Sequence, residues 1–256
     1  MTDAPKPTPP LSEEDLKEMP FTAHLLELRT HLVRVFGAVI GLFLLLVGFS
    51  RQLYTLFSAP LREQLPATAT MIATDVTSTF MAPIRLTLYA AVFLAMPYIL
   101  HQIWQFVAPG LYKQEKKLAI PLLVASVLLF YLGVAFAYYL ALPGILKFFI
   151  HFSPETVTPM TDIDSYLNFV LKLFLVFGLT FEIPVLTLVL ILAGIVSVAA
   201  LVDKRRYIIV GCFVLSAVVT PPDGLSMLLL AIPMWLLFEL GLLFGRMLEG
   251  QRARDA

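Results

Sequence analysis

Six long stretches of this sequence carry no charged residue, except for one glutamate in the fourth. They cover residues 35–50, 86–103, 118–146, 173–202, 207–222 and 224–238. A helix crosses a hydrocarbon core of about 30 Å with roughly 20 residues, so each stretch is a candidate membrane span. With 59% hydrophobic and 14% charged residues, the composition is too apolar for a soluble domain of this length. The sequence predicts an all-α membrane protein with six transmembrane helices.

The fifth and sixth stretches are shorter than the third and fourth. At about 1.5 Å per residue, about 16 helical residues cover only about 24 Å. We therefore expect short fifth and sixth helices in a concave bundle, with a thinner bilayer beside them. Between them, TPPDG at 220–224 predicts a tight turn in which Asp223 is a turn former.

The distribution of lysine and arginine predicts the orientation. Six spans place both ends of the chain on one side, and the other side then holds only five of the 18 basic residues, namely Arg51, Arg62, Arg85, Lys147 and Lys172. The positive-inside rule puts both termini in the cytoplasm. The predicted organisation is a disordered, proline-rich tail over 1–20, a six-span domain over 21–248 and a second tail over 249–256. The balance of 18 basic and 18 acidic residues gives no indication of a nucleic-acid surface.

Glu182 is the only charged residue between Lys172 and Asp203. An ionised carboxylate inside a bilayer costs several kcal/mol or more, so this acid should be protonated, paired or facing a polar cavity. Pro184 cannot donate to the carbonyl group of Thr180, which predicts a kink beside the acid. Two interpretations stay open: a water-accessible groove that receives polar groups, and a protonated acid bonded to a neighbouring helix.

The segment FTAHLLELRTHLVRV has a helical pattern, with one apolar face and one face that carries His24, Glu27, His31 and Arg34. One interpretation is a helix on the membrane surface that then turns into the membrane, with Glu27 and Arg29 solvated. The loop between the second and third apolar stretches has the sequence IWQFVAPGLYKQEKKLAIP (103–121). It predicts a turn at Pro109 and places Trp104 at the headgroup level. By composition, Glu115 is a solvated acid among lysines.

The loops expected outside the cytoplasm have structural signals. Pro60 indicates a turn, Asp75 or Thr77 is a candidate N-cap, and TDIDSYLNF at 161–169 indicates a capped helix start. Cys212 is the single cysteine, which excludes an intrachain disulfide and a thiol metal site. The histidines have no metal-ligand spacing. No metal and no cofactor are therefore expected.

Several motifs together resemble one family. In chain order they are HLLELR (24–29), SAPL (58–61), MIATDVTSTF (71–80), the 103–121 loop, FGLTFEIPV (177–185), TPPDG (220–224) and AIPM (231–234). They resemble TatC, the polytopic subunit of the twin-arginine (Sec-independent) protein translocase, from about residue 20 to about residue 247. The resemblance implies a subunit, not an enzyme, in the bacterial cytoplasmic (inner) membrane. It would bind twin-arginine signal peptides of folded cargo and assemble in several copies with single-span TatA and TatB type subunits, for export driven by the protonmotive force.

The resemblance also implies roles for particular residues. Glu27, Arg29 and Glu115 match the signal-peptide site, and Glu182 matches the intramembrane acid of the family. Thr220 and Met227 are candidate docking positions for partner helices, with Met227 standing where some relatives carry a polar residue.

Two other classes of function remain as alternatives. An ion-coupled secondary transporter would also use an intramembrane acid such as Glu182, although the two halves of the chain show no repeated glycine and proline pattern. An intramembrane hydrolase would need a paired acid, or a nucleophile with a base, at the depth of Glu182, and the sequence has no evident one.

Overall fold

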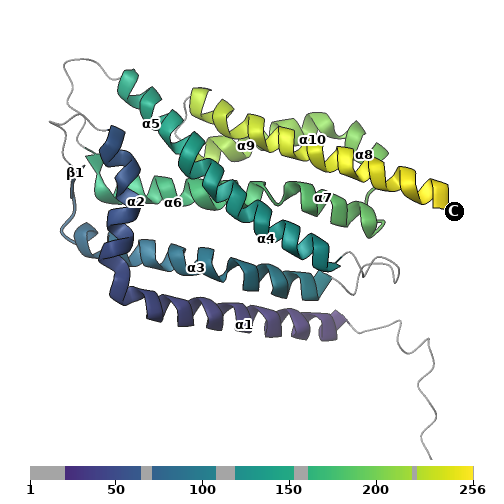
Figure 1. Ribbon diagram of the computed structural model, residues 1–256, viewed down its shortest axis with the longest axis horizontal. Coiled ribbons are helices and arrows are strands. Elements are labelled where there is room, and N and C mark those ends of the chain that lie inside the picture. Colours follow the sequence, from purple (N-terminus) through teal and green to yellow (C-terminus); the bar gives the residue numbers. More distant parts are fainter. Residues whose placement is uncertain (1–20, 65–70, 108–118, 153–160, 221–223, 256) are drawn as a thin grey trace, which may run out of the picture.

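The computed structural model describes residues 21–64, 71–107, 119–152, 161–220 and 224–255, and long helices lying side by side dominate it (Figure 1). Among the described residues, five helical segments are long and apolar enough to cross a membrane: Leu26–Ser58, Ser78–Phe106, Ala119–Phe149, Ile163–Leu192 and Ser226–Glu249. The predicted all-α membrane fold is therefore confirmed. Helix α9 (Arg205–Val219) has 15 residues and covers about 22 Å, as expected for a short fifth helix.

The first helix is continuous. Helix α1 (Phe21–Leu46) has no interruption, and a 3₁₀ turn, η1 (Val47–Phe49), follows it before α2 (Ser50–Gln64) turns away (Figure 1). The interpretation in which the amino-terminal segment turns between a surface helix and a span is therefore wrong. The range 21–46 contains no proline, so nothing in it breaks the backbone hydrogen bonds.

Helix α2 corrects a second expectation. Pro60 lies inside this helix and not in a turn. A proline in a helix removes one backbone hydrogen bond, but tertiary packing supplies most helical stability in proteins. Here Leu53, Tyr54 and Phe57 of α2 pack against the main hydrophobic core, which favours the helical conformation.

The central spans are α3 (Ser78–Val107), the pair α4 (Ala119–Phe136) and α5 (Leu142–His151), and the pair α6 (Ile163–Thr180) and α7 (Ile183–Leu192). A single π-helical turn, η4 (Ala137–Ala141), joins α4 to α5. Helix α1 packs against α3, and α4 packs against α6. The short helix α8 (Val198–Asp203) precedes α9.

The last helix is longer than predicted. Helix α10 (Gly224–Asp255) has 32 residues and packs against α7 and α9, so the expectation of a short sixth helix is wrong. The apolar stretch ended before Glu239 in the sequence, but the carboxylate of Glu239 accepts a hydrogen bond from Nη2 of Arg205 at 2.6 Å. The charge that bounds the apolar stretch is thus paired, and the helix continues through it.

Aromatic residues form the centre of the bundle, with Phe130, Phe174 and Phe177 almost fully buried. Helices α4 and α6 approach each other closely there because two of their residues are glycines. A Cβ atom on Gly133 would lie 2.6 Å from the carbonyl oxygen of Phe177, and one on Gly178 would lie 2.5 Å from the ring of Phe130. The contact between these helices therefore requires glycine at both positions.

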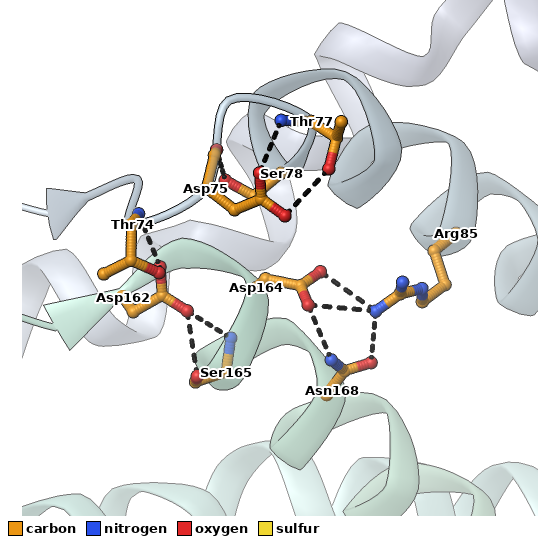
Figure 2. A network of polar contacts seen from close by, with 9 residues as sticks. All are labelled: Thr74, Asp75, Thr77, Ser78, Arg85, Asp162, Asp164, Ser165 and Asn168. Atoms are coloured by element: carbon orange, nitrogen blue, oxygen red, sulfur yellow. Dashed lines mark hydrogen bonds and ion pairs between the residues drawn. The ribbon is translucent and has the colours of Figure 1, made fainter.

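At one end of the bundle, two short strands pair in parallel: β1 (Met71–Ile72) with β2 (Thr161–Asp162). Figure 2 shows the polar side chains beside them. The carboxylate of Asp75 accepts hydrogen bonds from the backbone and the hydroxyl group of Thr77, just before α3. Asp162 is the N-cap of α6 and accepts from the backbone of Ser165, so the predicted capped start of this helix is confirmed.

Candidate functional site

The helix that carries Glu182 is broken next to that residue. Helix α6 ends at Thr180 and α7 begins at Ile183, with Pro184 in its first turn, which confirms the predicted kink. Glu182 occupies the N-cap position of α7, yet its side chain makes no capping hydrogen bond. The carboxyl group is therefore not used to end or begin a helix and is left for other contacts.

The Glu182 side chain lies in a groove of about 300 Å³ between α3, α4 and the α6–α7 break. The groove is lined by Leu100, Ile103, Trp104, Ser126, Leu179, Glu182, Val185, Leu186 and Val189. Besides the carboxyl group of Glu182, the polar side-chain atoms among these lining residues belong to Trp104 and Ser126. The site is thus an apolar groove with one small polar centre.

The polar centre links three helices. Nε1 of Trp104 donates to the hydroxyl oxygen of Ser126 at 3.3 Å, and Ser126 in turn interacts with the carboxyl group of Glu182. Oε1 of Glu182 is buried and has no hydrogen-bond partner among the described residues. A buried polar atom without a partner is costly, so this oxygen favours a ligand or partner group that donates a hydrogen bond.

Sequence reasoning missed both companions of Glu182. Trp104 was considered only as an aromatic residue at the headgroup level; it is 8% exposed and lines the groove. Its indole N–H has Ser126 as a partner, which allows the ring to be buried. Ser126 is a hydroxyl residue inside a long apolar stretch, and this contrast could have indicated a role for Ser126.

The structure contains elements of both interpretations of Glu182. The side chain lies in a groove, and Ser126 on the neighbouring helix α4 contacts its carboxyl group.

A second set of expected residues lies on α1. Glu27 and Arg29 are both exposed there, whereas Glu115 lies outside the described residues. One turn after Glu27, Nδ1 of His31 donates to Oε1 of Gln102 on α3 at 2.6 Å. The ring of His31 also meets Phe106 edge to face, with 6.4 Å between the ring centroids.

Exposure on α1 does not follow the division into a polar and an apolar face. His31 of the polar face contacts α3 while Glu27 of the same face is exposed, and Leu28 and Leu32 on the apolar face are exposed as well. Exposed leucines are expected in a membrane protein, because lipid solvates apolar side chains, and His31 finds its polar partner inside the bundle. The contact fixes how α1 presents Glu27 relative to α3.

Comparison with known proteins identifies the family. A family model described as "Sec-independent protein translocase protein (TatC)" matches residues 23–233. The chain belongs to the TatC family. The Sec-independent protein translocase protein TatC of Azotobacter chroococcum mcd 1 is 56% identical over 229 residues, which cover 90% of each chain. The TatC protein of Escherichia coli strain K12 is 49% identical over 241 residues, covering 94% of this chain and 93% of the relative.

Solved TatC structures share the fold. A crystal structure titled "Twin Arginine Translocase Receptor- TatC" superimposes with a TM-score of 0.80 at 36% identity, covering 88% of this chain and 98% of the other. A second one, in the detergent DDM, gives a TM-score of 0.79. As a TatC family member, this protein is a multi-pass membrane component of a bacterial Sec-independent protein translocase.

Two of the remaining residues with an expected role, Thr220 and Met227, lie on the pair of helices α9 and α10. Thr220 is buried at the C-cap of α9, and its hydroxyl group donates to the carbonyl oxygen of Ser216 at 2.8 Å. Met227 is half-buried in the first turn of α10. Asp223 and Pro109 were predicted as turn residues and lie outside the described residues.

The polar network at the β1–β2 end holds the start of α6 against α3 (Figure 2). Nη1 of Arg85 on α3 donates to both oxygens of Asp164 at 2.9 and 3.1 Å, and to the amide oxygen of Asn168 at 2.9 Å. Asp162 accepts from the backbone and the hydroxyl group of Thr74 at 3.1 and 2.9 Å. The network ties the second and fourth predicted spans together at one end of the bundle.

The hydrogen bonds to Asp162 also stabilise its ionised form. The backbone and side chain of Ser165, followed by those of Thr74, lower the pKa of Asp162 to about 2. Its carboxyl group is thus ionised over the whole physiological range of pH, and the cap of α6 stays intact there.

Proposed function

We propose that this protein is the receptor subunit of a twin-arginine protein translocase. It binds the twin-arginine signal peptides of folded cargo proteins and docks single-span subunits of the TatA and TatB type for export driven by the protonmotive force. The observation that carries the proposal is the shared fold, over 88% of the chain, with a solved structure titled as a twin arginine translocase receptor. That agreement, together with the family match, favours a translocase subunit over the ion-coupled transporter.

The signal-peptide site is assigned to Glu27, Arg29 and Glu115. A guanidinium group is planar and always charged, and it binds a carboxylate through two parallel hydrogen bonds. Two arginines therefore fit two acids near the same membrane surface. The exposure of Glu27 on α1, and the bond between His31 and Gln102 that holds the helix, support this assignment.

The groove at Glu182 is assigned to a polar group of the bound peptide or of a partner helix. Oε1 of Glu182 needs a donor that the described residues do not provide, and the apolar walls suit a helix or an extended apolar segment. Thr220 and Met227, at the α9–α10 hairpin, are assigned to a second contact with partner helices. Because the hydroxyl group of Thr220 already donates to Ser216, it offers a partner only its acceptor capacity.

The proposed location is the bacterial inner membrane, with both termini in the cytoplasm and tails over 1–20 and 249–256. The support is the excess of lysine and arginine on that side of the six-span arrangement. In this orientation Glu27 and Arg29 lie near the cytoplasmic surface, and the β1–β2 end of the bundle lies on the opposite side.

The test is photocrosslinking of a twin-arginine signal peptide to the full-length protein in inverted membranes. The wild type is compared with Glu27→Ala plus Glu115→Ala, and with Asp203→Ala as a control that removes an exposed acid elsewhere. We expect arginine-dependent crosslinks that the double variant loses and the control keeps. A wild-type protein that crosslinks a peptide with and without paired arginines equally would contradict the receptor proposal.

A twin-lysine peptide tests the pairing geometry separately. Loss of bidentate pairing should cost about 1 to 3 kcal/mol per contact, because lysine is a compact point charge without the fork of donors. Equal affinities of the twin-lysine and twin-arginine peptides would refute bidentate binding. The receptor proposal itself is tested by the crosslinking experiment and not by this comparison.

A further inference from the structure

A second groove, of about 460 Å³, lies between the beginning of α9 and the middle of α10. It is lined by Arg205, Leu236, Glu239, Leu240, Leu242, Leu243 and Arg246. Leu236, Leu240 and Leu243 recur at helical spacing and are about half exposed, so they form an apolar strip along α10. The groove therefore combines an apolar wall with charged groups, and neither the signal-peptide site nor the Glu182 groove includes these residues.

The charges in this groove do not balance. Arg205 and Arg246 bring two positive charges and Glu239 brings one negative charge, which leaves one positive charge in excess. Glu239 accepts from Nη2 of Arg205, but Nε of Arg205 is buried and has no hydrogen-bond partner among the described residues. Arg246 is exposed, and no ion pair to it is found in the described part of the chain. The groove thus has unused guanidinium donors.

The lengths of the two helices place these arginines at a membrane surface. Helix α9 begins at Arg205 and covers about 22 Å, which is less than the roughly 30 Å of a hydrocarbon core. A short span draws lipid headgroups inward, towards its first residue. Helix α10 continues beyond this level, and Arg246 lies seven residues after Glu239, about 10 Å further along the helix. Both arginines can therefore reach a headgroup while Leu240 and Leu236, further from Arg246 along α10, contact its acyl chains.

We propose that this groove binds one anionic phospholipid, with its phosphate between Arg205 and Arg246 and an acyl chain that runs inward along Leu240 and Leu236. Phosphate oxygens satisfy guanidinium donors, and basic pockets between transmembrane helices suit anionic headgroups. An apolar partner helix would cover the leucines but leave the excess positive charge without a partner. The proposal is independent of the proposed receptor function.

The test uses the purified full-length protein in detergent and native mass spectrometry with added phosphatidylglycerol or phosphatidylcholine. We expect phosphatidylglycerol to bind the wild type more tightly and Arg246→Gln to weaken it about five-fold. That factor corresponds to about 1 kcal/mol for each basic residue near a membrane surface. Arg34→Gln, which removes an exposed arginine from α1, is the matched control and should bind like the wild type.

Arg205 needs a paired substitution, because Arg205→Gln alone leaves Glu239 as an unpaired charge. Arg205→Gln with Glu239→Gln removes both charges, and it should also weaken phosphatidylglycerol binding. If Arg246→Gln and this double variant both bind phosphatidylglycerol like the wild type, the proposal is overturned. Equal binding of the two lipids by the wild type would overturn it as well.

Two further measurements separate the lipid from other occupants. Phosphatidylglycerol with a photoreactive acyl chain should label α10 near Leu240, and inorganic phosphate in excess should not reduce the labelling. If phosphate reduces the labelling, the site is assigned to a free anion. If an added peptide of a partner helix blocks the labelling as well in Arg246→Gln as in the wild type, the groove is assigned to that helix. Either result would reject the lipid proposal.

Discussion

The carbonyl oxygen of Phe177 lies 2.6 Å from the position that a Cβ atom on Gly133 would occupy. This distance is shorter than real Cβ contacts, and the neighbouring atom belongs to backbone that cannot turn aside. The α4–α6 contact at the centre of the bundle thus depends on a missing methyl group.

We predict that Gly133→Ala destabilises the protein by about 1 to 3 kcal/mol, the usual cost of overpacking a filled core. Thermal unfolding of the purified protein in detergent measures the effect. Gly211→Ala on α9 is the matched control, since no atom lies within 4 Å of its added Cβ atom, and it should be neutral or slightly stabilising. Equal melting temperatures for the two variants would show that α4 and α6 can move apart at little cost.

We predict that His31→Ala destabilises the protein by about 1 to 3 kcal/mol, because Gln102 is 4% exposed and would lose its partner. His101→Ala is the control, since it removes an exposed histidine bonded to Gln105 on the same helix and should change stability by less than about 0.5 kcal/mol. Chemical unfolding in mixed micelles compares the two. If both variants unfold alike, the α1–α3 contact is not held by this hydrogen bond.

We predict that Glu182→Gln keeps the fold and lowers transport several-fold. The glutamine keeps the size of the side chain and can still interact with Ser126, but it cannot carry a charge or release a proton. Thermal unfolding checks the fold, and export of a twin-arginine reporter checks transport. Ser126→Ala removes only the neighbouring hydroxyl group and should have the smaller effect on export. Unchanged transport by Glu182→Gln would argue against a role for charge or proton transfer.

We predict that the advantage of the wild type over Asp162→Asn depends on pH. The pKa of Asp162 is lowered to about 2 by its hydrogen bonds, below the value of about 3.9 for an unfolded chain. A lowered pKa adds stability that is fully present above the unfolded value and is lost as the pH falls through the folded value. The difference in melting temperature should thus be constant above about pH 5 and shrink between about pH 4 and pH 2. A difference that stays constant down to pH 2 would contradict the role of the ionised cap.

Local sequence signals predicted much of the fold. The apolar stretches indicated the spans, TDIDS indicated the cap at Asp162, and Pro184 indicated the break beside Glu182. These features depend on a few neighbouring residues, because hydropathy, capping and the missing N–H of proline act locally.

The features that the sequence did not predict depend on distant partners. The sixth apolar stretch stops before Glu239, which made the last span look short, but the charge of Glu239 is paired with Arg205 on the preceding helix. The burial of Trp104 also involves a distant partner, because its indole N–H donates to Ser126 on another helix. Glu182 could be identified as a candidate from one segment, whereas its groove is assembled from three.

The pairing of Arg205 with Glu239 has a consequence for biosynthesis. The two residues are separated by 34 positions, so a growing chain exposes Arg205 long before its counter-charge has been synthesised. We expect the last two helices to enter the membrane together as a nearly neutral hairpin. Chains that end before Glu239 would keep an uncompensated arginine, and quality-control proteases should remove them faster than chains that end after it.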